Sequence, residues 1–436
     1  MTPDTAVSEA ERTPPAWRVL VPAGIVEAAV LGAAGWWPGG APAVILMPLL
    51  AVAFVVYALA ASRVMRAQGG HTTIWLFAIA MRLVLLPCAP ELSHDVYRYL
   101  WDGHIQVAGI NPFRYAPLDP SLIALRTSWF GLLPDPHGLT PFPPAAQIAF
   151  AALALAGGTV LQAKLLWVAL DLTAGWVLGR IAAFTGRSRR LTQILYLWSP
   201  LLIVEVAWNG HMAPLLVLGI CLVILLARAP GAAGVAAAVA TLAAWAPIGA
   251  LAPLTARLGR RFLMAFLALA AALTIPYVGA GTGMFGGLAR HFGAHRFFEG
   301  PFLLIDSAVP NSMVAHAITG VAVVGVVAWA TAQRFRPERA LFWTLGAILL
   351  VTPELRPWFV LWVLPMAALR ADRTWLLFSG LVLLTYAGID VYRETGTWPQ
   401  PLWARLAVWL PFLALLTRDA MLAWRRRFPL PVHPTG

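Results

Sequence analysis

An acidic and aromatic stretch at residues 93–103 concentrates reactive side chains in a chain that is otherwise strongly apolar. It opens with His94 and Asp95 and continues through Arg98 to Asp102. A carboxylate can take the proton of an attacking hydroxyl, and an arginine can hold a phosphate by its planar fork. Charge beside lipid is costly and indicates a function. We therefore expect acid–base chemistry where the bilayer meets water.

Residues 94–106 are predicted to form an amphipathic helix that lies along the membrane interface. At about 100° per residue, one stripe of this helix carries Asp95, Arg98, Tyr99, Asp102 and Gln106. The opposite side carries Tyr97, Leu100, Trp101 and His104. We expect the carboxylates to face a cavity and the rings to face lipid, with Gly103 and the Asn111–Pro112 turn ending the helix. The plainer alternative is a surface ion pair beside an ordinary aromatic belt.

Later polar blocks are predicted to lie on the same face of the membrane. They occupy residues 205–211, 290–299 and 352–358. The candidate binding residues in them are Glu205, Asn209, His211, Arg296 and Arg356, and the second block also holds Arg290, His291 and His295. Each block also has a plainer explanation. Block 205–211 could cap a helix, block 290–299 could carry charge for hydration of a loop, and Arg356 in block 352–358 could form a local ion pair with Glu354.

No spacing of the candidate ligands indicates a closed zinc site. Carboxylates with open positions could hold Mg²⁺ or Mn²⁺, so a divalent cation is possible, and no other cofactor is expected. A nucleotide-binding phosphate loop is absent from the sequence.

The composition predicts an all-α polytopic membrane protein. The chain has 436 residues, of which 60% are hydrophobic and 11% are charged, against about 25% charged residues in soluble domains. The net charge of +12 comes almost entirely from arginines between apolar segments. This is the positive-inside pattern, so we expect a lipid bilayer and not nucleic acid as the partner of this charge.

The apolar segments predict about 12–14 transmembrane or half-membrane helices in a single domain at 18–422. Cytoplasmic tails are expected at 1–17 and 423–436, and external loops at about 90–144 and 280–308. Segment 231–257 is either one crossing or two half-helices broken near Pro247, and the positive-inside rule favours the second. Full crossings are expected near 73–89 and 212–227, among others. No internal repeat is apparent, which disfavours a transporter built from two related halves.

Several motifs resemble those of integral membrane glycosyltransferases of the GT-C type. The main one is His94-Asp95-Val96-Tyr97-Arg98-Tyr99-Leu100-Trp101-Asp102-Gly103, followed by Gly109-Ile110-Asn111-Pro112. Supporting pieces are Thr140-Pro141-Phe142-Pro143-Pro144, Ser199-Pro200-Leu201 with Glu205, Asn209-Gly210-His211, and Arg356-Pro357-Trp358-Phe359 with Trp362 and Pro365. The chain is most similar to bacterial polyprenol-phosphate-mannose-dependent α-1,6-mannosyltransferases. It departs from their pattern at Met212-Ala213, Ala244-Trp245 and Arg356, where an acid, a lysine and a histidine are common.

The resemblance implies that a hexose, mannose in that group, moves from a polyprenyl-phosphate donor to a glycolipid or glycan acceptor. The reaction would take place at the outer face of the plasma membrane, and Asp95 would be the catalytic base. Arg98, Arg296 or Arg356 would stabilise the leaving phosphate, and Asp102 would orient the acceptor or hold Arg98. The remaining predicted substrate-binding residues are His94, Asn111, Glu205, Asn209 and His211. A transporter or a flippase for lipid-linked sugars is the alternative, and a non-catalytic assembly partner is a third possibility.

Overall fold

The computed structural model of the chain describes residues 15–288, 290 and 296–427. Over these residues the fold is built from helices, and β-structure is limited to two isolated bridges. The predicted all-α class is therefore confirmed. His291, His295 and most of the two predicted tails lie outside the described residues. The last helix continues to Arg427, beyond the predicted end at residue 422.

The first half of the chain forms, in order, α2 (Trp17–Gly35), α3 (Ala43–Val64), α4 (His71–Leu85), α5 (Asp95–Val107), η1 (Pro120–Leu125), η2 (Phe130–Leu132), α6 (Pro144–Leu155), α7 (Val160–Phe184), α8 (Arg189–Leu197), α9 (Pro200–Ile203), η3 (Val204–Trp208) and α10 (Ala213–Leu225). The second half forms α11 (Pro230–Ala243), η4 (Ala246–Ala250), α12 (Leu251–Leu258), α13 (Arg260–Thr274), η5 (Ile275–Phe285), α15 (Pro301–Ala308), α16 (Ser312–Ala332), α17 (Pro337–Val351), η6 (Pro357–Trp362), α18 (Leu364–Arg370), α19 (Arg373–Leu381), η7 (Val382–Gly388), α20 (Ile389–Thr395) and α21 (Leu402–Arg427). The η segments are 3₁₀-helical, except that η3 is one π-helical turn.

Seven helices within the described residues are long and apolar enough to cross a bilayer, and a bent pair formed by α8 with α9–η3 can count as an eighth. Shorter apolar helices are α4, α6, α10 and α11. The predicted total of 12–14 is reached only if these shorter helices count as half-membrane helices. The prediction of full membrane crossings near 73–89 and 212–227 is wrong, because the helices found there are short. α4 has 15 residues and α10 has 13. A crossing helix needs about 20, so helices of this length depend on protein neighbours.

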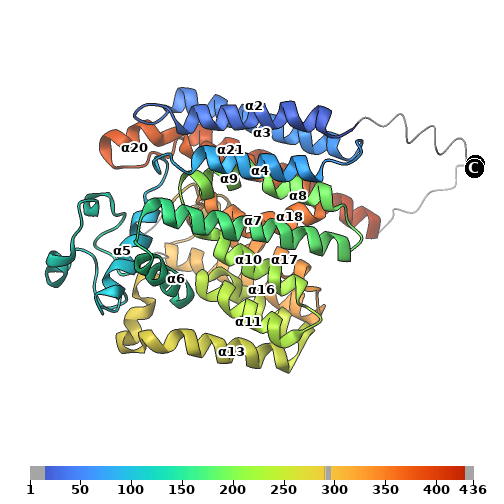
Figure 1. The fold of residues 1–436 in the computed structure, drawn as a ribbon. Coiled ribbons are helices and arrows are strands. Elements are labelled where there is room, and N and C mark those ends of the chain that lie inside the picture. Colours follow the sequence, from blue (N-terminus) through green and yellow to red (C-terminus); the bar gives the residue numbers. More distant parts are fainter. Residues whose placement is uncertain (1–14, 289, 291–295, 428–436) are drawn as a thin grey trace, which may run out of the picture.

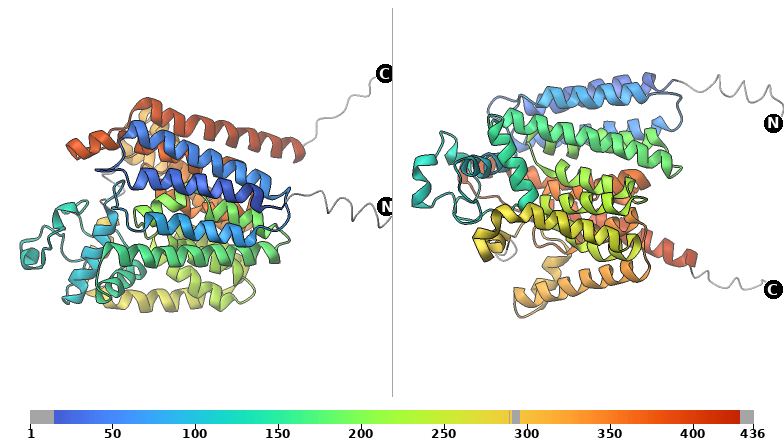
Figure 2. Two further views of the ribbon diagram at one scale, coloured as in Figure 1. Left: turned by 45° about the horizontal axis from the view of Figure 1, so that its top comes forward. Right: turned by 60° about the horizontal axis from the view of Figure 1, so that its bottom comes forward.

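The long helices run side by side, and α5 projects with its following loop from one end of the bundle (Figure 1). The beginning of α2 and the end of α21 lie at the opposite end (Figure 2). The loop after α5 is thus separated from the start of α2 and the end of α21 by the length of the helices.

Segment 231–257 is broken, as the arginine pattern favoured. α11 stops at Ala244, where the backbone is extended at φ −153° and ψ 140°, and η4 and α12 follow. Gly234, near the start of α11, lies directly against the Phe262 carbonyl, near the start of α13. Both helices therefore begin at the same end of the bundle. Pro247 contributes to the break because it has no N–H for a continuing helix.

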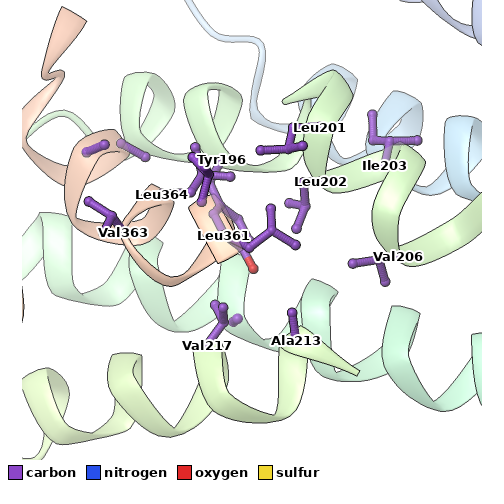
Figure 3. Close-up of a cluster of buried hydrophobic side chains, with 14 of the residues drawn as sticks. Tyr196, Leu201, Leu202, Ile203, Val206, Ala213, Val217, Leu361, Val363 and Leu364 are labelled. Carbon is purple, nitrogen blue, oxygen red and sulfur yellow. The ribbon is translucent and has the colours of Figure 1, made fainter. Parts of the chain in front are cut away.

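The core behind the site is a cluster of buried apolar side chains from α8, α9, η3, α10, η6 and α18 and from the residue between the last two. It includes Tyr196, Leu201, Leu202, Ile203, Val206, Ala213, Val217, Leu361, Val363 and Leu364 (Figure 3). Residues about 150 positions apart in the sequence meet here. This packing places the π-helical turn η3 next to η6, and both segments carry side chains of the candidate site.

Candidate active site

A cavity of about 920 Å³ lies at the end of the bundle that carries α5. Its polar lining includes His94, Asp95, Arg98, Glu354 and Arg356. These side chains come from α5 and from the segment between α17 and η6. Two of the predicted polar blocks, far apart in sequence, therefore meet in one cavity.

Asp95 is the first residue of α5 and lines the cavity with its side chain 25% exposed. The backbone N–H of Asp95 donates to Ser93 Oγ at 3.3 Å. The positive end of the helix dipole stabilises a carboxylate in the first turn of a helix. Asp95 is thus held at a helix start with access to the cavity, as a general base requires.

His94 is the residue before α5 and also lines the cavity. Its ring meets Tyr97 edge to face, with centroids 5.8 Å apart. Burial lowers the pKa of His94, and the smaller effect of Glu91 opposes it. The imidazole is therefore neutral near pH 7, beside the carboxylate that the sequence marks as the base.

His211 lies behind Asp95 and is almost fully buried. Its Nδ1 is 3.8 Å from Asp95 Oδ2 and 3.3 Å from the Tyr99 hydroxyl. Burial, with a smaller effect of Arg356, lowers the pKa of His211 to about 3. Burial also raises the pKa of Tyr99. A protonated Tyr99 hydroxyl that donates to Nδ1 leaves the imidazole proton on Nε2.

The Nε2 side of His211 meets a second buried acid. His211 Nε2 is 3.4 Å from Glu205 Oε2, and the Tyr386 hydroxyl donates to Glu205 Oε1 at 2.7 Å. Gly210 has φ +74°, a left-handed conformation that glycine adopts without strain. This turn and the π-helical turn before it bring His211 and Glu205 together. π-helical turns are frequent at functional sites.

Arg98 and Asp102 form a buried clamp within α5. Arg98 Nε donates to Asp102 Oδ1 at 2.9 Å, and the other two guanidinium nitrogens donate to the carbonyls of Asp135 and Gly138. Gln147 of α6 donates to Asp102 Oδ2 at 3.0 Å. Asp102 is therefore turned toward α6. The expectation that it faces the cavity is wrong, because α6 covers that side of the helix.

The aromatic side of α5 also differs from the prediction. Trp101 is fully buried against Leu122, Leu133 and Phe130 of the following loop. The loop folds back over the rings, so Trp101 packs on protein where lipid was expected. Gly103 allows the close approach on the other side, since an added Cβ would collide with the Phe150 carbonyl of α6.

Four other predicted site residues are held away from the cavity lining, and Arg356 is not. Asn209 is buried and accepts from the Leu92 N–H at 3.2 Å, and Glu205 is enclosed by its partners. Asn111 donates to the Tyr277 carbonyl at 3.2 Å and joins the loop after α5 to η5. Arg296 pairs with Asp306 at 3.7 Å. Arg356 does line the cavity, 27% exposed, and its Nε donates to Glu354 at 2.6 Å.

Several residues that the sequence reasoning did not select contribute to the site. Tyr386, Tyr392 and Trp398 line the cavity from η7, α20 and the segment after α20, and Gln147 completes the α5 clamp. Tyr386 and Tyr392 lie in the second half of the candidate span Arg373–Thr395, and Trp398 lies just after it, so an aromatic belt was the available signal. No signal in the sequence pairs Gln147 with Asp102, since the two belong to different helices.

Within the described residues, no group of three histidine, cysteine or acidic side chains could hold a metal ion. Comparison with known proteins returned no match among family models, curated proteins or solved structures.

Proposed function

We propose that this chain is an integral membrane glycosyltransferase. It moves a hexose, mannose by the sequence resemblance, from a polyprenyl-phosphate donor to a hydroxyl of a glycolipid or glycan on the outer face of the plasma membrane. The observation that carries the proposal is that one cavity is lined both by the Asp95 carboxylate and by apolar side chains of α16, α17 and η4, which we call the apolar arm. A substrate with a lipid tail and a polar head needs both.

The apolar arm is lined by Val323 of α16, by Ile348 and Val351 of α17, and by Ile248 of η4. α16 itself exposes large apolar side chains along its length, namely Met313, Val321 and Val324. A helix that is apolar on its exposed side is suited to contact with lipid. An isoprenoid chain entering beside α16 would stay in an apolar environment while its phosphate reaches the polar end of the cavity.

Asp95 is the candidate base for the acceptor hydroxyl. As the new glycosidic bond forms, the hydroxyl proton passes to the Asp95 carboxylate and the polyprenyl phosphate leaves with the electron pair of the broken bond. A single base acting on the acceptor implies single displacement with inversion at the sugar. A positioned proton acceptor contributes about 10²- to 10⁴-fold to the rate.

Arg356 is the best candidate for the leaving phosphate among the three arginines considered. Its guanidinium is partly exposed to the cavity, whereas Arg98 directs its nitrogens at Asp102 and two carbonyls. Arg296 pairs with Asp306 and is not part of the cavity lining. A cation aimed at the charge that develops on the leaving group lowers the barrier.

Transfer of radiolabelled mannose from polyprenyl-phosphate mannose by the purified full chain tests the proposal. Mannosylated short-chain alkyl glycosides serve as acceptor probes. We expect wild-type transfer, and a loss of about 10²- to 10⁴-fold in Asp95→Asn. Asp119→Asn is the matched control, because Asp119 is an exposed acid of the same loop. Asn also keeps the ability to cap η1.

Equal transfer by wild type and Asp95→Asn would remove Asp95 from the base role. If no sugar is transferred, but labelled lipid-linked sugar crosses sealed proteoliposomes that contain the chain, the transporter or flippase reading replaces the enzyme.

A further inference from the structure

Trp358 separates the buried histidine from the cavity. Its ring stacks on His211 with centroids 3.9 Å apart and planes inclined by 23°. Trp358 is half-buried and belongs to the cavity lining. One face of the indole is therefore covered by the imidazole, the Arg356 guanidinium lies 5.8 Å from the ring centroid, and the ring borders the cavity beside it.

Three more rings line the same cavity, and we call Trp358, Tyr386, Tyr392 and Trp398 the aromatic wall. All four residues line the cavity. Trp398 Nε1 donates to the Thr385 carbonyl at 2.9 Å, and its ring lies 4.7 Å from that of Tyr392 and 6.0 Å from that of Tyr386. Tyr386 is fixed by its bond to Glu205. The wall is thus held in place by contacts outside the cavity.

We infer that Trp358 is the platform on which the sugar ring of the acceptor stacks. The inference rests on the proposed glycosyl transfer. The apolar face of a pyranose carries axial C–H bonds, and the negative face of an indole attracts such positive edges.

The position of the wall assigns it to the acceptor and not to the donor. His211 contacts Trp358 on one side and approaches Asp95 to 3.8 Å on another, so a sugar stacked on Trp358 lies beside the base. The apolar arm suited to the donor lipid comes from α16, α17 and η4, whereas the wall comes from η6, η7, α20 and Trp398. Arg356, the candidate partner of the leaving phosphate, lies 5.8 Å from the centroid of the Trp358 ring. A sugar stacked on Trp358 would therefore lie near both the base and the leaving phosphate, which is the place of the attacking acceptor.

Binding and kinetics together test this assignment. Saturation-transfer NMR with α-1,6-mannotetraose and no donor measures binding to the full chain, in a detergent without sugar headgroups. KM is then measured for donor and acceptor separately. The variants are Trp358→Leu and Trp358→Phe, and Trp176→Leu is the matched control, since Trp176 is 47% exposed on the outside of α7.

We expect Trp358→Leu to weaken binding and raise the acceptor KM by about 10- to 100-fold, with the donor KM unchanged. Trp358→Phe should recover most of the loss because it keeps a ring face, and Trp176→Leu should match wild type. Unchanged binding and acceptor KM in both Trp358 variants would overturn the inference while leaving glycosyl transfer intact. A rise confined to the donor KM would also overturn it. Trp358-dependent oligosaccharide binding without any sugar transfer would support the subsite and count against the proposed reaction.

Discussion

Replacing Asp102 with Asn should lower the local stability of α5, the helix that carries Asp95. The substitution itself alters no residue of the cavity lining. Asp102 and Arg98 have side chains 1% and 5% exposed, so water cannot replace their mutual bond. Asp102→Asn removes the buried negative charge and leaves the guanidinium uncompensated. Breaking a buried pair from one side costs about 3–5 kcal/mol. Arg98 keeps two carbonyl acceptors, so we expect a value near the lower limit, about 3 kcal/mol.

Hydrogen–deuterium exchange of residues 95–107 measures this loss directly. A cost of about 3 kcal/mol, at 1.4 kcal/mol for each tenfold change, predicts amide exchange about 100-fold faster in α5. Transfer activity should fall in parallel, because Asp95 is the first residue of the same helix.

Asp419→Asn is the matched control for Asp102→Asn. It removes the same charge from an exposed pair with Arg418 in α21, outside the clamp and the cavity lining. Exposed pairs contribute about 0–1 kcal/mol, so exchange in α5 should be close to wild type. If Asp102→Asn also exchanges like wild type, the clamp does not hold α5 and this reasoning is refuted.

Two further predictions concern stability. His211 has a pKa of about 3 in the folded chain and an ordinary value of 6.5, so the unfolded chain binds more protons between these pH values. The contribution of His211 to the free energy of unfolding is therefore fully present above about pH 6.5. It falls as the pH drops, by roughly 2 kcal/mol at pH 5. His211→Gln should flatten the slope of melting temperature against pH between 5 and 7. A variant as steep as wild type would assign the slope to other groups. Arg82→Met leaves Asp171, its fully buried partner at 2.6 Å, without compensation. It should cost about 3–5 kcal/mol by denaturation in detergent, with the double variant Arg82→Met/Asp171→Leu recovering most of this. A double variant no better than the single one would contradict the account.

Patterns within short stretches of the sequence predicted where helices form and break, but not which other segments pack against them. The 94–106 stripe predicted α5, which spans Asp95–Val107, and the arginines predicted the break in segment 231–257. Both follow from periodicity and from the cost of charge in lipid, which act within a few residues. The direction of Asp102 and the burial of Trp101 were mispredicted, because α6 and the loop after η1 cover faces of α5 that periodicity alone leaves open.

The amino-acid order by itself determined that this chain is a bundle of apolar helices with its chemistry gathered at one end, and it singled out Asp95 and Arg356 as residues of that end. Only the tertiary structure decided that His211 lies beside Asp95 with Glu205 behind it, and that Trp358 stacks on His211 while Tyr386 bonds Glu205. Tyr386 reaches Glu205 across 181 residues of sequence. Such a contact depends on how short, broken helices pack together. That packing is a property of the whole bundle, and no local pattern of residues encodes it.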